Sequence, residues 1–339
     1  MIATDGGRIA EPERPSGGGP EVSVAMCTYH GGAYLAEQLQ SIAAQDRVPD
    51  ELVVCDDGSG DATPSILRGF AARAPFTVRL EFNGQNLGST QNFAKAVSLC
   101  RGRIIFLADQ DDLWKPQKVR RLADAISADP GIGFAFSDAR LVDAQGQPSG
   151  YTLWQSLSFE PADQARFNAA GAFDLLLRRN VVTGTTMAFR SDFCELLLPV
   201  PSGWVHDGWF ALLLAAVARG RALAEPLVDY RQHARQQIGA GPGTMLDKYR
   251  RRKRQGLGLY AATADNYAQA WERLNRAQDR LLDRSILAAL AAKIDHWRTR
   301  ARMRIDPAWR APTIAREILR GSYERYSAGW KSVAEDILV

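Results

Sequence analysis

The sequence predicts an α/β fold in which a Rossmann-like parallel sheet is followed by a helical carboxyl-terminal extension. From Glu21 onward, short apolar runs rich in β-branched residues alternate with helical stretches, which is the pattern of βαβ units. Of the 339 residues, 46% are apolar and 24% are charged, as in packed globular proteins. After Met245 the sequence is rich in Ala, Leu and Arg and contains no convincing strand.

Predicted strands and helices alternate through the first part of the chain. The strands are Val22–Thr28, Glu51–Asp56, Thr77–Phe82, Arg103–Ala108 and Ile132–Ser137. Apolar residues at helical spacing predict covering helices over Ala33–Ala44 and Ser89–Cys100. Asp61 followed by Pro64 predicts a third helix, because aspartate caps a helix start and proline suits its first turn.

The alternation becomes less regular after residue 139. We expect a turn at Asp143–Gly146, a short helix over Phe173–Arg179, a strand over Thr185–Arg190 and a buried helix over Trp209–Arg219. Helical sequence then continues, with breaks near Gly256, Asp306-Pro307 and Pro312. A boundary near Gly239–Gly243 divides the chain into a disordered tail (1–20), a main α/β domain (21–240) and a basic helical region (241–339).

Neither a membrane span nor a disulfide framework is indicated. No apolar run reaches the ~20 residues of a transmembrane helix, and the first residues lack the pattern of a secretory signal. The four cysteines lie far apart, without a Cys-x-x-Cys pair. These observations favour a cytoplasmic location.

Positive charge is concentrated towards the carboxyl terminus. Residues 245–339 hold 20 Lys and Arg against 11 Asp and Glu, whereas residues 1–244 hold 22 against 27. The run Lys248–Arg254 suits anionic lipid headgroups, so peripheral attachment to the inner face of the cell membrane is one expectation. A solvated helix end is the alternative. No nucleic-acid partner is expected, because no recognition module accompanies the run.

Polar residues follow three of the predicted strands at their carboxyl ends, the edge where α/β sheets bind ligands. They are Thr28 and Tyr29, then Asp56 and Asp57, then Asp109, Asp111 and Asp112. These carboxylates would repel one another unless a cation neutralised them. Hard cations take oxygen ligands, so Mg²⁺ or Mn²⁺ is expected. For Asp109 or Asp112 alone, capping of a helix near Lys115 is the alternative.

Five sequence blocks resemble the signature of glycosyltransferase family 2. They are Val22–Tyr29, Gln38–Gln45, Asp56–Asp61, Asn86–Asn92 and Leu107–Trp114. The resemblance covers about Glu21 to Ala240 and implies the GT-A fold, with a Rossmann-like mixed sheet. It also implies transfer of a sugar from a nucleotide-diphospho-sugar to a hydroxyl. Leu107–Trp114 and His206–Trp209 look most like bacterial rhamnosyltransferase-like enzymes of surface polysaccharide assembly. That likeness implies dTDP-rhamnose or a UDP-sugar as donor and a glycan or lipid-linked acceptor.

The resemblance also implies how the donor is held. Asp57 would hydrogen-bond the base, while Thr28 and Tyr29 would line the nucleotide pocket. Asp109 would approach the ribose, and Asp111 would hold the metal that bridges the donor phosphates. Such a cation neutralises the charge that builds on the departing diphosphate.

On the acceptor side, the resemblance implies that Asp207 is the catalytic base of an inverting transfer. His206 stands where the family usually has Glu, and Trp209 in the same run would contact substrate. Asn180–Thr185 resembles the loop beneath the donor sugar, where Gly184 would permit close approach of the backbone, and a turn before a strand is the alternative. Capping of the following helix is the alternative for Asp207.

The stretch Tyr230–His233 resembles a Tyr-Arg-x-His run of rhamnosyltransferase-like members. Arg231 would pair with phosphate oxygens, and His233 would ligate the metal or touch the diphosphate. An ordinary polar role is the alternative for His233. Two other functions stay open: a sugar nucleotidyltransferase, disfavoured because Thr28–Gly32 lacks Arg and Lys, and a nucleotide-sugar-binding scaffold subunit.

Overall fold

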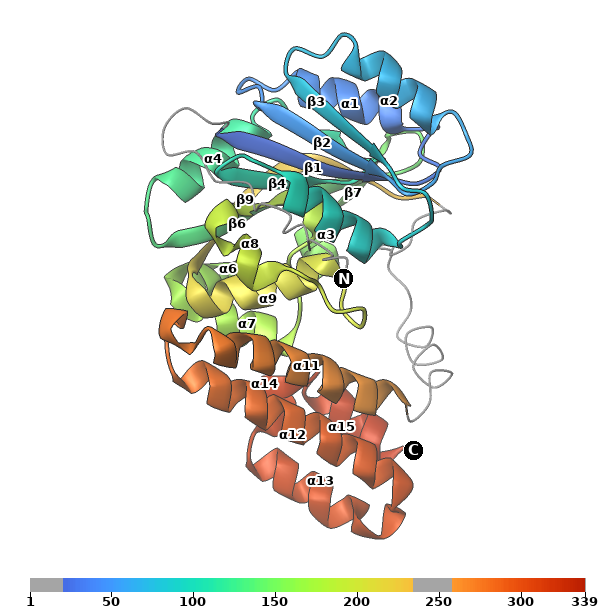
Figure 1. Cartoon of the computed structure of the whole chain (residues 1–339). Coiled ribbons are helices and arrows are strands. Elements are labelled where there is room, and N and C mark those ends of the chain that lie inside the picture. The colour runs from blue at the N-terminus through green and yellow to red at the C-terminus, as the bar shows by residue number, and fades with distance from the viewer. Residues whose placement is uncertain (1–20, 234–257, 339) are drawn as a thin grey trace, which may run out of the picture.

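The computed structural model describes residues 21–233 and 258–338. A mixed sheet with helices on both faces occupies one end of the molecule, and a helical bundle extends from one of the helical layers (Figure 1). The predicted tail over 1–20, the boundary near Gly239–Gly243 and the basic run Lys248–Arg254 lie outside the described residues.

One nine-stranded sheet runs through the described residues, in the order β3-β2-β1-β4-β8-β6-β9-β5 with β7 on β6. The strands are β1 (Val22–Thr28), β2 (Glu51–Asp56), β3 (Thr77–Phe82), β4 (Ile104–Ala108), β5 (Leu113–Trp114), β6 (Ile132–Val142), β7 (Pro148–Thr152), β8 (Met187–Arg190) and β9 (Arg219–Arg231). β1 pairs in parallel with β2 and β4, whereas β8 is antiparallel to β4 and β6. The sheet is therefore mixed, as the family resemblance implies, and not wholly parallel as the strand pattern alone predicts.

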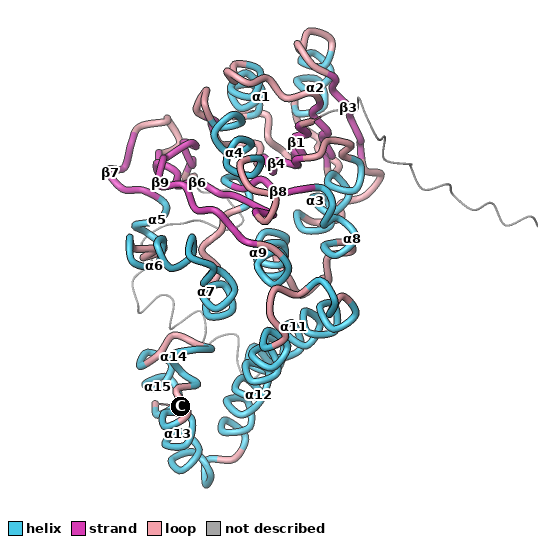
Figure 2. Tube along the Cα trace, turned by 90° about the vertical axis from the view of Figure 1, so that its left-hand side faces the viewer, coloured by secondary structure: helices cyan, strands magenta, loops and turns pink. Residues whose placement is uncertain are grey.

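Helices pack on both faces of this sheet through two separate apolar clusters. They are α1 (Leu35–Ala43), α2 (Thr63–Ala71), α3 (Ser89–Leu99), α4 (Lys118–Ser127), α5 (Leu153–Ser156), α6 (Pro161–Arg166), α7 (Ala172–Arg178), α8 (Cys194–Leu197) and α9 (His206–Val217). Apolar residues of α1, α2 and α4 join one cluster. Those of α3, α7 and α9 join the other. Figure 2 shows the two layers on opposite sides of the strands.

Within residues 258–338, five helices form the bundle beyond the second layer: α11 (Gly258–Arg276), α12 (Ser285–Ile305), α13 (Arg310–Leu319), α14 (Ser322–Tyr326) and α15 (Trp330–Ile337). Ala270 and Leu274 of α11 and Leu290 of α12 are fully buried in the same cluster as α9. The bundle therefore packs directly on the α/β part. Among residues 258–338 no strand occurs, as the sequence predicts.

Most of the predicted elements are confirmed, with small shifts at their ends. The first three strands have the predicted bounds, while β6 is five residues longer than expected and α9 begins three residues earlier. Strands β5, β7 and β9 were not predicted. β9 carries Pro226 and pairs with β6 through irregular register, so its sequence lacks the clean alternation of a half-buried strand.

Within residues 21–233 and 258–338, no helix combines the length and hydropathy that a bilayer span requires.

Candidate active site

The carboxyl ends of β1, β2 and β4 bring the acidic residues to one edge of the sheet. Asp57 follows β2 and Asp109 follows β4, and these two strands flank β1. Neighbouring strands lie about 4.8 Å apart, so the backbones that carry the two aspartates lie roughly 10 Å apart. Burial raises the pKa of the Cys27 thiol on β1, and both carboxylates add to that rise. Asp57 and Asp109 therefore lie at the same edge of the sheet, on either side of β1.

Asp57 orders the loop that follows β3. Its Oδ1 accepts hydrogen bonds from the Asn83 side chain (2.8 Å) and the Leu87 backbone N–H (2.8 Å), and its Oδ2 accepts from the Gly88 N–H (2.9 Å). A carboxylate has about four acceptor positions, so protein donors fill three of them. Beside it, the Thr28 hydroxyl donates to Asp56 (2.7 Å) and is buried.

Gln110 ties the acidic loop to the end of β1. Its side-chain amide accepts from the Tyr29 N–H (2.8 Å) and donates to the Tyr29 carbonyl (3.0 Å). A Cβ at Gly31 would lie 2.2 Å from the Gln110 side-chain oxygen, so only glycine leaves room for this pairing. The Tyr29 side chain is 49% exposed, and its ring can therefore contact a ligand at this rim.

Three aspartates after β4 form a dense negative cluster. Burial raises the pKa of Asp109 well above its ordinary value, and the charges of Asp112, Asp111 and Asp207 raise it further. Burial and the charge of Asp111 raise the pKa of Asp112 to about 7. Neither Asp109 nor Asp112 caps α4, which begins at Lys118 after Gln117. The capping alternative is thus wrong for both residues.

A fully buried lysine lies below this cluster. The Lys118 ammonium donates to the Thr185 carbonyl (2.5 Å) and sits over the Trp114 ring, 3.3 Å from its centroid. Burial lowers the pKa of Lys118, while the charges of Asp112 and Asp109 oppose that shift. This cation offsets part of the negative charge.

Asp111 and His233 lie together at the open side of the cluster. The His233 Nε2 atom is 2.8 Å from the Asp111 Oδ2 atom, and both side chains are only slightly exposed. The His233 ring also lies beside the Tyr34 ring, with centroids 4.9 Å apart. The two predicted metal ligands are therefore brought together from β9 and from the loop after β4.

The Arg231 side chain makes contacts that differ from the predicted ones. Its side chain is 3% exposed and donates to the Asp111 carbonyl (2.9 Å), the Ala144 carbonyl (3.0 Å) and the Glu37 carboxylate (2.7 Å). Its guanidinium also stacks over Tyr34. The predicted role of Arg231 in pairing with phosphate oxygens needs correction, because these protein acceptors hold the guanidinium in the interior. Arg231 fixes the acidic loop instead.

Asp207 lies at the start of α9 and faces the Gly184 loop. Its Oδ2 accepts from the Gly184 N–H (3.2 Å), and its Oδ1 accepts from the Gly208 N–H (2.5 Å) and lies 3.5 Å from the Asn180 amide nitrogen. Burial raises the pKa of Asp207 to about 6, although the two backbone N–H groups oppose the rise. The N-cap residue of α9 is Val205, so Asp207 does not occupy the capping position.

His206, next to Asp207, is buried and neutral. Its ring stacks on Phe93 with centroids 4.0 Å apart, and burial lowers its pKa to about 3. A Cβ on Gly184 would lie 2.8 Å from the His206 Nε2 atom. The imidazole thus occupies the space that a side chain at position 184 would need. The packing of His206 by itself accounts for a glycine at this position.

Trp209 does not line the site. Its side chain is fully buried in the core, and its indole N–H donates to the Leu197 carbonyl (2.7 Å). The predicted substrate contact of Trp209 is wrong, because on this helix the residue two positions after Asp207 points into the protein.

The carboxyl-terminal bundle holds the segment that leads into Asp207. Arg273 of α11 donates to the carbonyls of Leu196 (2.7 Å), Leu198 (3.0 Å) and Pro199 (2.9 Å). Farther along, the Asn266 side chain donates to the Gly203 carbonyl (2.7 Å). The bundle therefore fixes the segment that precedes Asp207.

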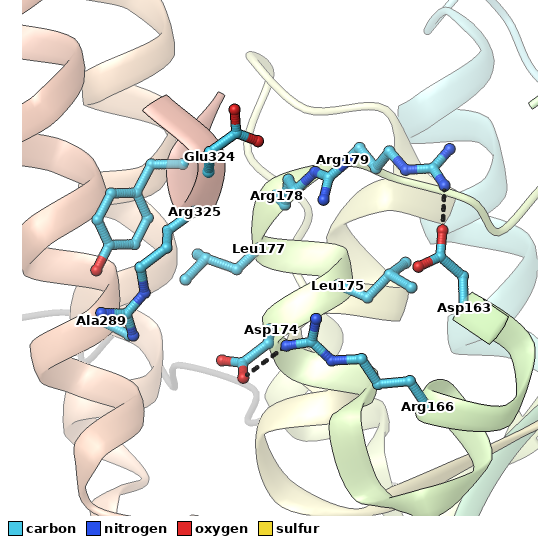
Figure 3. A pocket seen from close by; sticks show the side chains of 11 residues that line it. Asp163, Arg166, Asp174, Leu175, Leu177, Arg178, Arg179, Ala289, Glu324 and Arg325 are labelled. Atoms are coloured by element: carbon cyan, nitrogen blue, oxygen red, sulfur yellow. Dashed lines mark hydrogen bonds and ion pairs between the residues drawn. The ribbon is translucent and has the colours of Figure 1, made fainter. Parts of the chain in front are cut away.

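A pocket of about 240 Å³ lies between α7 and α14, away from the acidic cluster (Figure 3). Two of its arginines are already paired, Arg166 with Asp174 and Arg179 with Asp163. Figure 3 shows the Arg325 side chain pointing away from Arg166 and Arg179. The guanidinium groups of these three arginines therefore do not converge on one point of the pocket.

The residues at the rim fit a divalent cation that also binds phosphate. Asp111 offers a carboxylate and His233 an imidazole, both ligands that Mn²⁺ accepts. Within residues 21–233 and 258–338, no three His, Cys, Asp or Glu side chains form a complete metal site. Magnesium typically binds through one or two carboxylates plus substrate phosphates, and such incomplete sites suit it.

The sequence patterns did not single out Lys118, Glu37 or the bridging role of Gln110. Lys118 lies on the apolar face of α4 beside Val119 and Leu122. A lysine on the apolar face of a helix was the signal in the sequence that a buried positive charge lies there.

The mixed sheet, with an acidic loop after β4 and helices on both faces, defines a protein of the GT-A fold. The sequence profile described as glycosyl transferase family 2 matches residues 23–193, half of the chain. The chain belongs to glycosyl transferase family 2, and the predicted family and fold are confirmed.

Curated relatives match part of this chain. An uncharacterised protein of Mycobacterium bovis is 28% identical over 216 residues, which cover 63% of this chain and 59% of that protein. Chondroitin synthase of Escherichia coli is 30% identical over 148 residues, 43% of this chain and 21% of the synthase. The chain thus spans less than two thirds of the length of these relatives.

Two solved structures share the fold. S. aureus TarS in complex with UDP-GlcNAc superposes with a TM-score of 0.56 at 17% identity, over 82% of this chain and 72% of TarS 1-349. The mannosyltransferase PcManGT of Pyrobaculum calidifontis, in complex with GDP-Man and Mn²⁺, gives a TM-score of 0.51 at 20% identity, over 94% of this chain and 84% of that chain.

Proposed function

We propose that the chain is an inverting glycosyltransferase that moves a sugar from a nucleotide-diphospho-sugar to a hydroxyl of a glycan or lipid-linked acceptor. The observation that carries the proposal is the approach of Asp207, from α9, to the aspartates after β4. Asp207 accepts from the Gly184 N–H (3.2 Å), and the next residue, Thr185, accepts from Lys118 beside the aspartates (2.5 Å), so one short loop joins Asp207 to the acidic cluster. The charge of Asp207 also adds to the raised pKa of Asp109. A base opposite a diphosphate-binding cluster is the arrangement that an in-line displacement requires.

In the proposed step, Asp207 accepts the proton of the acceptor hydroxyl as its oxygen attacks the anomeric carbon of the donor sugar. The bond between that carbon and the diphosphate oxygen breaks, and its electron pair leaves with the nucleoside diphosphate. The Gly184 N–H and the Asn180 amide hold the Asp207 carboxylate in orientation.

On the leaving-group side, Asp111 and His233 are the residues that would hold Mg²⁺ or Mn²⁺, which stabilises the charge of the diphosphate. Arg231 acts on this step through Asp111, because it fixes the loop that carries the carboxylate. Tyr29 lines the nucleotide pocket, and Asp57 accepts one further hydrogen bond from the base while it orders the Leu87 loop.

The donor is proposed to be dTDP-rhamnose or a UDP-sugar, and the product a bacterial surface polysaccharide. The UDP-GlcNAc of TarS and the GDP-Man and Mn²⁺ of PcManGT support a nucleotide-sugar donor and a divalent ion. The Escherichia coli chondroitin synthase and the Rhizobium meliloti succinoglycan biosynthesis protein ExoO support a role in polysaccharide assembly.

The test is nucleoside-diphosphate release from a panel of UDP-, GDP- and dTDP-sugars, with and without Mn²⁺. The Asp207→Asn variant should lose transfer by about 10²–10⁴-fold yet keep metal-dependent nucleotide binding. Asp174→Asn, which changes an exposed carboxylate on α7, is the matched control and should keep full activity. Transfer at the wild-type rate by Asp207→Asn would remove Asp207 as the base.

The two alternatives give different products. A sugar nucleotidyltransferase would release pyrophosphate from a nucleoside triphosphate. A scaffold subunit would bind nucleotide-sugars and release no nucleoside diphosphate from any donor.

A further inference from the structure

Large apolar side chains are unusually exposed in the carboxyl-terminal bundle. Across the described ranges, thirteen large apolar or aromatic side chains are exposed, and six of them fall within residues 305–338. Scattered exposed apolar residues need no explanation, but such a concentration marks an interaction surface.

Two of the six meet at the turn between α12 and α13. Ile305 is 73% exposed and Trp309 is 68% exposed, and both line a groove of about 410 Å³. Arg302 and Arg316, both exposed, line the same groove from either side. These four residues are termed the tip patch.

Exposed arginines surround the tip patch. Residues 298–320 contain seven arginines and two acids, and Arg298, Arg302, Arg316 and Arg320 are exposed, whereas Arg300 is buried and pairs with Asp336. One acid, Asp306, lines the groove and accepts the Ala308 N–H at 3.1 Å, and the other, Glu317, is buried against His296. The exposed face therefore presents apolar side chains among guanidinium groups.

We propose that the tip patch docks on an anionic lipid bilayer. An exposed tryptophan and isoleucine suit the boundary between headgroups and acyl chains, and arginines pair with anionic headgroups. A protein partner would need acidic residues around an apolar surface of matching shape. An anionic membrane presents negative headgroups and apolar acyl chains over its whole area. The inference goes beyond the proposed function, since the patch lies at the end of α12 that points away from the sheet (Figure 1).

The experiment is flotation of the full chain with phosphatidylcholine vesicles, with or without phosphatidylglycerol, at low and high salt. The wild type should float only with phosphatidylglycerol and release at high salt. The Ile305→Ala/Trp309→Ala variant should bind at least about tenfold more weakly. Each of Arg302→Gln and Arg316→Gln should weaken binding about fivefold.

Leu282→Ala is the matched control. Leu282 is 54% exposed and precedes α12, so it lies about 30 Å from the tip patch along that 21-residue helix. The control should bind vesicles as the wild type does. Circular dichroism and melting temperature check that every variant is folded, and transfer to a soluble acceptor should not change.

Three results would overturn the proposal. One is a wild type that stays unbound with phosphatidylglycerol at low salt. Another is an Ile305→Ala/Trp309→Ala variant that floats like the wild type, which would assign binding to another segment. The third is a wild-type dimer in light scattering that the same variant converts to a monomer, which would make the tip patch an interface between copies.

Discussion

The buried carboxylate of Asp207 should give sugar transfer a steep acid limb. Burial raises the Asp207 pKa from 3.8 to about 6. At about pH 5, roughly a tenth of such a group is ionised, whereas over 90% of an unperturbed aspartate would be. If Asp207 takes the acceptor proton, kcat/KM at about pH 5 should be about a tenth of its value at about pH 8.

The assay is the initial rate of nucleoside-diphosphate release across this pH range, for wild type, Asp207→Asn and the control Asp174→Asn. The acidic cluster also titrates, since the pKa of Asp112 is raised to about 7. Binding of nucleoside diphosphate with Mn²⁺ must therefore be measured at each pH. Only a decrease in kcat/KM at low pH that is larger than the decrease in nucleotide binding reports on Asp207.

Two results would refute this reasoning. An acid limb centred near pH 4, the ordinary range of an aspartate, would show that burial does not set the Asp207 pKa. An Asp207→Asn variant whose residual activity keeps the wild-type acid limb would place the titrating base elsewhere.

Other contacts of the site make further substitutions informative. The folded pKa of Asp207 exceeds its unfolded value, so the free energy of unfolding falls as pH rises from about 4 to about 6. Asp207→Asn should therefore raise the free energy of unfolding at about pH 8 by up to about 3 kcal/mol, measured in urea titrations. Arg231→Gln releases the acidic loop and should lower Mn²⁺ affinity, measured by titration, by about 10–100-fold. Trp209→Ala should cost about 3–5 kcal/mol of stability in urea and leave the donor KM unchanged, because Trp209 fills the core. Arg273→Met removes three bonds to carbonyls before α9, so kcat should fall about tenfold with nucleotide binding retained, and amide exchange should rise in residues 196–204.

The inner strands were predictable because they are buried on both faces. A parallel strand covered by helices on each side is a continuous apolar run, and β1 and β2 have that character. Such strands end on the same edge of the sheet, so the placement of Asp57 and Asp109 followed from the pattern. β9 was not predictable in this way, because Pro226 and an irregular register hide its period.

Side-chain roles were harder to predict than positions. Arg231 and Trp209 stand in the expected runs, yet the first binds Glu37 and backbone carbonyls while the second lies in the core. Which way a side chain points depends on neighbours up to 194 residues away in the chain. No local pattern contains that information.

The sequence by itself determined the family, the bounds of the inner strands and the acidic residues at their ends, since apolar periodicity and strand polarity are local properties. Only the tertiary structure decided that Asp207 approaches Asp109, that Lys118 lies beneath the aspartates and that the bundle holds the segment before α9. The physical reason is that charge interactions and burial depend on distances through space, and these arise only when remote segments pack together.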